Sequence, residues 1–389
     1  MSHTVTNLDS PEDLKRADIH GLTQVYLDFP VYAKEALNLA EGLEIPKEVQ
    51  VGNEVVHFST PKRVVLVGMG GSAICGDLLR GWLLDRVSIP VEVCMDYRLP
   101  SYVGGETLVF AVSYSGNTEE TLSAFVDAVR RGCMVVSISS GGLLTKFSKK
   151  LGFPHVQIPE GYAPRVALPY LFFPIPKILT KLGVKLDFME GEVLEAIKVL
   201  EELREECRPE TPIDGNPAKR LAMELHGFIP VVYGFRWLSP VARRMKGQFN
   251  ENSKVPSFHG SLPAINHDEI VGWNSKNELT RGFKLVLLRD RAEPPEIRNR
   301  IELTKRLASG RVGGVVEVWG RGVGRLARIL SLTYIGDLAS LYLAFLRGVD
   351  PLPIPAVTTI KEEMAKRLHT HQKLEEEVER LSRLTPNNR

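Results

Sequence analysis

Short runs rich in apolar residues alternate with helical stretches through most of the chain. In the first half these runs lie at 63–67, 91–94, 107–112 and 134–138, and apolar positions recur every three or four residues in the segments after 72 and 118. An apolar run of five or six residues is typical of a strand buried on both faces, as in a parallel sheet covered by helices. The pattern therefore predicts an α/β fold for this half.

The same alternation restarts near residue 229. Runs at 229–234, 284–288 and 315–319 are predicted strands, and helices are expected at 326–345 and from 358 to about 384. The order of strands, turns and helices is similar in both halves, which suggests a duplicated α/β unit. We therefore predict an α/β fold class with two doubly wound parallel sheets flanked by helices.

These boundaries divide the chain into five segments. Residues 1–60 are expected to form a helical N-terminal leader, 61–160 the first α/β domain, 161–225 a partly helical connector, 226–350 the second α/β domain, and 351–389 a C-terminal helix and tail. The first domain holds the turns that carry candidate binding chemistry, and the second holds the groups that can move protons.

The composition excludes several classes of protein. With 43% hydrophobic residues, 25% charged residues and a net charge of +2, the chain has no general nucleic-acid footprint. No apolar run approaches the about 20 residues that span a bilayer, and the first residues lack a signal-peptide pattern. We expect no nucleic-acid or membrane partner and a cytoplasmic location.

The four cysteines of the chain form no C-x-x-C pair. We expect them to be buried free thiols: Cys75, Cys94, Cys133 and Cys207.

The most informative segment is the hydroxyl-rich turn at 113–118, which follows a predicted strand and precedes a predicted helix. Its sequence is Ser113-Tyr114-Ser115-Gly116-Asn117-Thr118. A turn in that place gathers backbone N–H groups, hydroxyls and the positive end of a helix dipole, which suits a phosphate monoester. The alternative is that 115–118 is only a turn with a helix N-cap.

A second small-residue turn, Gly68-Met69-Gly70-Gly71-Ser72, follows the strand at 63–67. Its glycines do not match G-x-G-x-x-G, which disfavours a nicotinamide cofactor, and neither turn holds a Walker-type lysine, which disfavours nucleoside triphosphates. Together with the hydroxyls of the first turn, it favours a phosphate held by hydrogen bonds alone.

Two residues in the second half are candidates for proton transfer. Glu251 lies between two asparagines where a predicted helix ends, and His267 precedes two acidic residues, one of which could fix its tautomer. The alternatives are that Glu251 is a solvated helix end and that His267 is a polar loop residue. His259 and His267 are eight residues apart without helical register, so we expect no metal site.

Together these motifs resemble the archaeal bifunctional phosphoglucose/phosphomannose isomerases of the sugar isomerase (SIS) domain superfamily. The resemblance runs from about residue 60 to about residue 370. It rests on the segments Gly68-Met69-Gly70-Gly71-Ser72, Ser113-Tyr114-Ser115-Gly116-Asn117-Thr118-Glu119-Glu120, Asn250-Glu251-Asn252-Ser253-Lys254 and His267-Asp268-Glu269-Ile270. It implies two SIS-type domains, a homodimer, and interconversion of glucose 6-phosphate and mannose 6-phosphate with fructose 6-phosphate through a cis-enediolate, without metal or organic cofactor.

The resemblance also implies a role for each site residue. The phosphate of the hexose 6-phosphate would be bound by Gly70, Gly71, Ser72, Ser113, Ser115 and Thr118. Glu251 would be the base, and Arg165, in the segment Ala163-Pro164-Arg165, would stabilise the intermediate. His267 and Lys361 would take part in ring opening, with Lys366 and Lys373 as alternatives for the lysine.

Two other functions of the same superfamily stay as alternatives. A non-catalytic sugar-phosphate-binding regulator would keep the serine turns without needing Glu251 or His267, and it would usually carry a DNA-binding module, which we do not expect in residues 1–60. An amidotransferase of glucosamine 6-phosphate synthesis would need a glutaminase domain with an N-terminal cysteine, and the sequence gives no sign of one.

Overall fold

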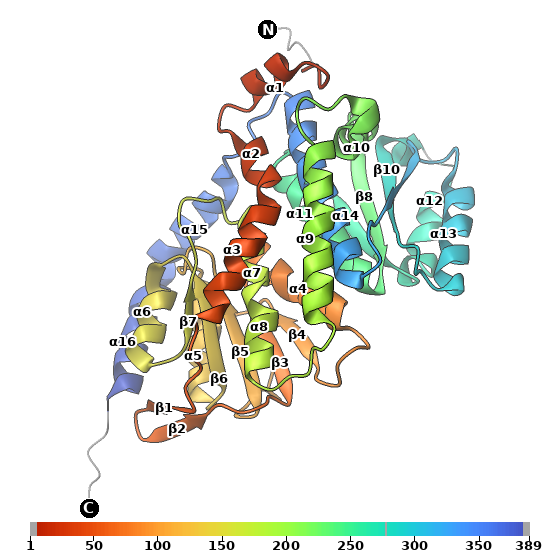
Figure 1. Ribbon diagram of the computed structural model, residues 1–389. Helices are drawn as coiled ribbons and strands as arrows, with labels where there is room; N and C mark the ends of the chain where they lie inside the picture. Colours follow the sequence, from red (N-terminus) through yellow and green to blue (C-terminus); the bar gives the residue numbers. More distant parts are fainter. Residues whose placement is uncertain (1–5, 277, 384–389) are drawn as a thin grey trace, which may run out of the picture. The chain divides into compact units, whose positions relative to one another are not determined.

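The computed structural model describes residues 6–276 and 278–383 and contains two compact units, each assembled from two stretches of chain. Unit 1 comprises Met1–Pro30 and Glu190–Pro353, and unit 2 comprises Val31–Met189 and Ile354–Arg389. Each unit holds one parallel sheet flanked by helices (Figure 1). This confirms the predicted α/β fold class.

The sheet of unit 2 has five parallel strands in the order β4-β3-β5-β6-β7. These are β4 (Val91–Cys94), β3 (Arg63–Val67), β5 (Thr107–Val112), β6 (Met134–Ser139) and β7 (His155–Gln157). Every residue of β5 and β6 is buried, because helices cover both faces of the sheet. The uninterrupted apolar runs in the sequence therefore correspond to the central strands.

Three strands of unit 2 lead directly into helices, and this connection builds the candidate site. β3 is followed by α4 (Gly71–Leu83), β5 by α5 (Glu119–Arg130), and β6 by α6 (Gly142–Leu151). The strands are parallel, so the three turns lie together at the carboxyl ends of the strands.

Unit 2 contains further helices and a pair of short strands. They are α3 (Phe29–Glu41), which begins at the division between the units, β1 (Glu48–Val51), β2 (Glu54–His57), α7 (Leu168–Phe172), α8 (Pro174–Lys181), α15 (Pro355–Leu368) and α16 (Thr370–Ser382).

The sheet of unit 1 has four parallel strands in the order β11-β10-β8-β9. These are β11 (Val315–Trp319), β10 (Phe283–Arg289), β8 (Ile229–Phe235) and β9 (Phe258–Leu262). The helices of this unit are α1 (Pro11–Ala17), α2 (Leu22–Leu27), α9 (Met189–Glu206), α10 (Pro217–Leu225), α11 (Ser239–Glu251), α12 (Glu269–Trp273), α13 (Pro295–Ala308) and α14 (Arg325–Leu346).

Helix α14 is the core helix of unit 1. Its 22 residues are long and apolar enough to cross a membrane by length and composition, and the most apolar part of the helix is entirely buried inside the protein. The expectation that no apolar segment approaches that length is therefore wrong for this helix. Burial on all sides explains the composition, since a helix without a solvated face needs no polar stripe.

Close packing and a buried ion pair hold α11 against α14. A Cβ atom on Gly336 would lie 2.4 Å from Cγ of Met245, so the two helices approach each other at a position where only glycine fits. At the neighbouring positions, the guanidinium group of Arg244 donates to both carboxylate oxygens of Asp337 at 3.0 and 2.8 Å, and both side chains are buried. These contacts fix the helix that ends at Glu251.

Several local expectations from the sequence are wrong. The leader is helical only to Glu41, and an antiparallel hairpin of β1 and β2 follows it. The predicted helix from 358 to 384 is two helices, because His369 has a left-handed backbone with a φ of 50°. The short strands β7 and β9 were not expected, since both lie at an edge of their sheet and neither has a continuous apolar run.

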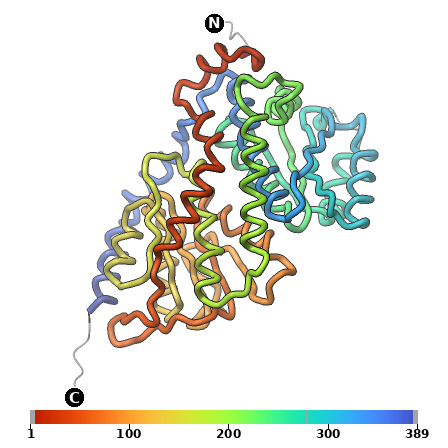
Figure 2. Tube along the Cα trace, viewed as in Figure 1, coloured from red at the N-terminus to blue at the C-terminus, as the bar shows by residue number. Residues whose placement is uncertain are grey.

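The two units also divide the chain differently from the predicted boundaries. The first helices, α1 and α2, belong with the second sheet, and the C-terminal α16 packs against α5 and α6 of the first. Figure 2 shows the blue C-terminal helix running beside the yellow α6, which is far away in the sequence. Sequence order cannot show such pairings, because the contacts join distant segments.

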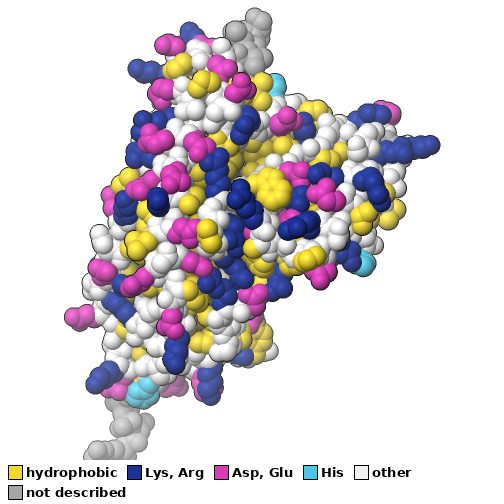
Figure 3. Space-filling model, turned by 45° about the vertical axis from the view of Figure 1, so that its right-hand side comes forward, with side chains coloured by type: hydrophobic (Ala, Val, Ile, Leu, Met, Phe, Trp, Pro, Cys, Tyr) yellow, Lys and Arg dark blue, Asp and Glu magenta, His cyan; other side chains and the backbone are white. Residues whose placement is uncertain are grey.

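The expectation that the cysteines are buried free thiols holds in the structure. All four are buried and free, and burial raises the pKa of both Cys133 and Cys207 to about 12, so these thiols stay neutral near pH 7. The face shown in Figure 3 carries both acidic and basic side chains.

Candidate active site

The turns that follow β3 and β5 meet at one edge of the sheet in unit 2. Ser72 and Ser113 are both buried, and the backbone N–H of Tyr114 donates to Oγ of Ser72 at 3.4 Å. Oγ of Ser113 lies 2.9 Å from Oγ1 of Thr118. The structure therefore brings together Ser72, Ser113 and Thr118, as the sequence predicted, in a group of hydroxyls beside the start of α4 and α5.

The turn after β6 joins this group. Both the backbone N–H and the hydroxyl of Ser140 donate to the carbonyl oxygen of Tyr114, at 2.8 and 2.7 Å. A Cβ atom on Gly116 would lie 1.8 Å from the carbonyl oxygen of Gly141, and Gly116 has a φ of +67°. Only glycine fits there on both counts. The spacing of the turns therefore depends on this glycine.

The hydroxyl of Thr118 is not used to cap a helix. Thr118 is the N-cap residue of α5, yet its side chain accepts no hydrogen bond from the backbone of that helix. Ser115 is exposed, and its Oγ accepts a hydrogen bond from the N–H of Asn117 at 3.3 Å, which closes a local turn. The alternative that 115–118 is only a turn with a helix cap does not account for the pairing of Thr118 with Ser113.

The segment that carries Arg165 lies against the first turn. A Cβ atom on Gly71 would be 3.3 Å from the carbonyl oxygen of Pro164 and 3.4 Å from Cα of Arg165, and the Arg165 side chain is buried. Gly70, the N-cap residue of α4, has a φ of +51°. Gly71 thus allows the loop with the predicted arginine to approach the first turn, while Gly70 supplies the left-handed backbone at the start of α4.

Tyr114 also shapes the site, although the sequence analysis assigned it no role. Its hydroxyl donates to the carbonyl oxygen of Pro159 at 3.2 Å and accepts from the N–H of Tyr162 at 2.7 Å. Burial raises the pKa of this hydroxyl, so it stays protonated and keeps both bonds. Tyr114 therefore ties the segment leading to Arg165 to the second turn. Its place between two serines of the turn was the only signal in the sequence.

Glu251 is the last residue of α11 in unit 1, as predicted, and the residues after it are firmly held. Nδ2 of Asn252 donates to the hydroxyls of Tyr26 and Ser340, each at 2.9 Å, and Oγ of Ser253 donates to the carbonyl oxygen of Ser340 at 2.6 Å. The backbone around Glu251 is thus fixed on both sides while its carboxylate is half-buried.

Lys254 also fixes this segment. Its Nζ donates to the carbonyl oxygens of Pro351 and Pro353, at 3.0 and 2.7 Å, and to that of Glu251. The lysine has a left-handed backbone with a φ of +51°. A non-glycine residue held in that conformation is uncommon and marks a segment that its surroundings constrain.

His267 follows a short turn after β9 and is exposed. The two acidic residues after it make other bonds: Glu269 accepts a hydrogen bond from the hydroxyl of Tyr233, and Asp268 accepts one from the backbone N–H of Glu269 at 2.6 Å. Burial and the bond to Glu269 raise the pKa of Tyr233, which stays a donor. In the described part of the chain, neither acid orients His267, so that expectation is wrong.

Glu251 and His267 lie at opposite ends of the strands of the unit 1 sheet. β8 and β9 are parallel, and α11 runs back between them, so its last residue lies near the amino-terminal ends of both strands. Nδ2 of Asn250 donates to the carbonyl oxygen of Ser257, whose own hydroxyl donates to that of Pro230 at the start of β8. His267 follows the far end of β9. At 13 residues, α11 spans about 20 Å between the two ends.

The predicted site residues thus fall into separate groups. Ser72, Ser113, Ser115, Thr118, Gly70, Gly71 and the Arg165 loop lie at one sheet edge of unit 2, Lys361 lies on the exposed helix α15 of the same unit, and Glu251 and His267 lie in unit 1. Among residues 6–276 and 278–383, no group of three or more His, Cys, Asp or Glu side chains could hold a metal ion.

Comparisons with known proteins show which family the chain resembles. Residues 214–364 match the family model of the bacterial phosphoglucose isomerase C-terminal SIS domain. A bifunctional phosphoglucose/phosphomannose isomerase of Caldicellulosiruptor bescii is 42% identical over 333 residues, which cover 85% of this chain and 97% of the relative. Another, of Aquifex aeolicus, is 38% identical over 317 residues, covering 80% and 94%. The crystal structure of a glucose-6-phosphate isomerase like protein from Thermus thermophilus has a TM-score of 0.56 and 22% identity, covering 90% and 98%, which shows the fold alone.

The hydroxyls of Ser72, Ser113 and Thr118 at the strand ends are expected to bind an anion. Replacing Ser113 by Ala removes a buried hydroxyl that points into the turn beside Thr118, and we expect the Kd for inorganic phosphate to rise about tenfold. Isothermal titration calorimetry measures it. Ser123→Ala, on the helix that follows the turn but away from it, is the matched control and should leave the Kd unchanged. Equal Kd values for the two variants would show that the hydroxyls are only structural.

Proposed function

Because the chain belongs to the family of bifunctional phosphoglucose/phosphomannose isomerases, we propose that it interconverts glucose 6-phosphate and mannose 6-phosphate with fructose 6-phosphate. The structural observation that supports this most is Glu251, a carboxylate at the end of a helix whose surroundings fix its backbone. A regulator that only binds sugar phosphates has no use for such a residue. The relatives that match most of the chain are isomerases, so the regulator alternative is not favoured.

The phosphate of the substrate would be bound by the serine turns. Hydroxyl and backbone N–H donors at the start of α4 and α5 can take a phosphate dianion without a lysine, and the helix dipoles favour its charge. Binding energy from this distant group holds C1 and C2 of the sugar in place, which contributes to catalysis without touching the reacting atoms.

Glu251 would act as the base that moves the proton between C1 and C2. In the aldose, the carboxylate removes the proton from C2 and the C1 aldehyde oxygen gains a proton, which gives the enediol. The C2 hydroxyl then loses its proton as its oxygen becomes the ketone, and the carboxylate delivers a proton to C1, either the one it removed or one exchanged with solvent. One carboxylate can serve both carbons, because they are neighbours. The guanidinium group of Arg165 would stabilise the negative charge on the enediolate oxygen.

Ring opening needs a separate acid and base, since hexose phosphates are mostly cyclic. His267 would supply this group, because an imidazole ring can both donate and accept a proton. Lys361, exposed on α15, would assist. Glucose 6-phosphate and mannose 6-phosphate differ only at C2 and give the same enediol, so one site can act on both when it allows protonation on either face.

A homodimer is part of the proposal. Glu251 and His267 of one copy lie at opposite ends of the strands of one sheet, separated by the length of α11, about 20 Å. One hexose cannot reach both. When both act on the same sugar, they therefore come from two copies of the chain, and a two-fold symmetric dimer would contain two such sites.

The isomerase proposal predicts a metal-independent reaction that depends on Glu251. Purified protein given fructose 6-phosphate in excess EDTA should form both glucose 6-phosphate and mannose 6-phosphate, measured separately by coupled enzymes. Glu251→Gln should lower kcat by about 10²–10⁴, because a general base is lost. Glu296→Gln, an exposed glutamate of α13, is the control and should keep full activity. A native protein that binds fructose 6-phosphate but does not convert it would instead favour the regulator.

The dimer proposal predicts that two inactive variants restore each other. In a hybrid of Glu251→Gln with His267→Ala, one of the two sites keeps both native side chains. Random mixing should therefore recover about a quarter of native activity, because half of the dimers are hybrids with one intact site each. Activity is measured after the two purified variants are unfolded and refolded together. No recovery, with hybrids present by native mass spectrometry, would mean that one copy supplies both residues.

A further inference from the structure

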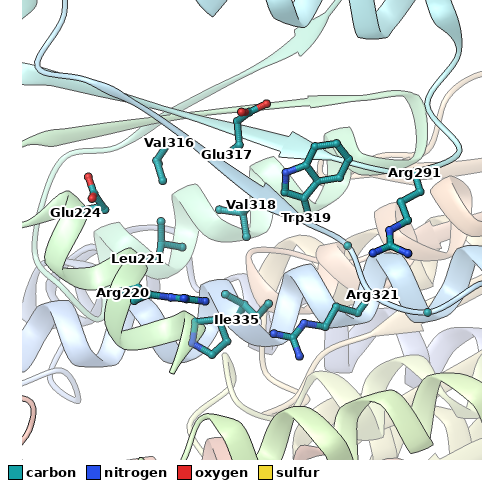
Figure 4. Close-up of a pocket in the computed structure, with 13 residues that line it drawn as sticks. Arg220, Leu221, Glu224, Arg291, Val316, Glu317, Val318, Trp319, Arg321 and Ile335 are labelled. Carbon is teal, nitrogen blue, oxygen red and sulfur yellow. The ribbon is translucent and has the colours of Figure 1, made fainter. Parts of the chain in front are cut away.

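A cavity of about 600 Å³ lies at the edge of the unit 1 sheet, and none of the site residues assigned above lines it (Figure 4). One wall is the exposed face of α10, and the other is the edge strand β11 with the Gly320-Arg321-Gly322 loop after it. Arg291, two residues after the end of β10, closes one end. The cavity thus lies beside the carboxyl end of two neighbouring parallel strands, where α/β sheets usually bind their ligands.

The corresponding crevice between β8 and β10 is closed by side chains. The indole N–H of Trp237 donates to a carboxylate oxygen of the buried Asp290 at 2.7 Å, and Nε of Arg328 donates to the same oxygen at 2.9 Å. In unit 2 the equivalent position, between β3 and β5, holds the serine turns. In unit 1 the open space is therefore one strand further out, at β11.

Three arginines give the cavity an excess of positive charge. Arg220 and Arg321 extend toward each other from opposite sides in Figure 4, and Arg291 lies beside Trp319. Arg321 is paired with Glu206, but in the described part of the chain no carboxylate is paired with Arg220 or Arg291. Guanidinium groups are well suited to phosphate, which they bind through two parallel hydrogen bonds.

The two carboxylates that line the cavity are already neutralised by cations. Glu317 is paired with Arg289 and with Lys305, and Glu224 with Lys284. The acidic side chains therefore do not balance the three arginines of the lining. An anion entering the cavity would meet cations without displacing an internal ion pair of Arg220 or Arg291.

Trp319 adds a planar surface to this charged cavity. It is the last residue of β11 and 44% of its surface is exposed, while the guanidinium of Arg289 lies 4.5 Å from its ring centre. Below it the cavity is lined by the apolar side chains of Leu221, Val318 and Ile335. An exposed indole beside apolar walls is a surface on which a flat ring can stack.

We propose that this cavity is a nucleotide-binding site, in which the arginines bind a diphosphate group and Trp319 stacks against the base. A diphosphate matches several guanidinium groups, whereas a hexose 6-phosphate offers one phosphate and no planar ring. The site is separate from the serine turns and does not depend on the proposed isomerase activity.

The test uses ADP as the probe and the fluorescence of the full-length protein as the signal. Of the four tryptophans, Trp82 and Trp237 are buried and the half-buried Trp273 does not line the cavity. Trp319 lines the cavity and is exposed, so bound ADP should quench its emission in a saturable way. Arg291→Ala should raise the Kd for ADP about tenfold, because one charge-assisted contact is lost. Arg306→Ala, an exposed arginine of α13 outside the cavity, is the matched control and should leave the Kd unchanged. Trp319→Phe should abolish the quench.

Competition distinguishes this site from the serine turns. Saturating fructose 6-phosphate should not displace ADP, and the Kd for ADP should be the same in Ser113→Ala and in the native protein. Displacement by fructose 6-phosphate would place ADP on the serine turns and overturn the proposal. The absence of a saturable quench, or equal Kd values for Arg291→Ala and Arg306→Ala, would overturn it as well.

Discussion

The crossover from β8 through α11 to β9 is the constraint on which the proposed catalytic arrangement depends. Because the two strands are parallel, the helix between them must return to the edge where they begin, and this separates Glu251 from His267 by the length of the helix. The ion pair of Arg244 with Asp337 and the close approach at Gly336 hold that helix in place. Breaking a buried pair of this kind by removing one partner costs about 3–5 kcal/mol. The backbone of Glu251 is therefore held in place by the core packing of unit 1.

The two units use one architecture in two different ways. In unit 2 the ends of β3, β5 and β6 come close because glycines replace side chains where the turns touch, and hydroxyls occupy the space that results. In unit 1 an indole, a buried carboxylate and a guanidinium close the corresponding crevice. A duplicated α/β unit can thus keep its sheet while its binding chemistry changes, because the sheet core and the strand-end loops are separate parts of the sequence.

Much of the fold could be predicted from the sequence, and the reasons are physical. Central strands such as β5 are buried on both faces, so their apolar runs are unmistakable, and the hydroxyls of the serine turn follow such a strand. The edge strands β7 and β9 lack this signal, because part of each is exposed and polar. The surroundings of the proposed proton-transfer residues could not be predicted, because they depend on contacts between distant segments. The hydroxyl of Tyr233 donates to Glu269, the acid that was expected to orient His267, and the hydroxyl of Tyr26 accepts a hydrogen bond from Asn252.

We propose that Glu251 transfers a proton between C1 and C2 through an enediolate, and exchange of that proton with solvent is the sharpest check of this step. Fructose 6-phosphate is converted in D₂O, and the deuterium at C2 of both aldose products is measured by nuclear magnetic resonance. Because a proton held on the carboxylate exchanges with solvent in part of the turnovers, we expect deuterium at C2 of glucose 6-phosphate and mannose 6-phosphate, and far slower formation of both by Glu251→Gln. Products that carry only hydrogen at C2, formed by Glu251→Gln as fast as by the native protein, would indicate transfer of a hydride between the carbons and would contradict this mechanism.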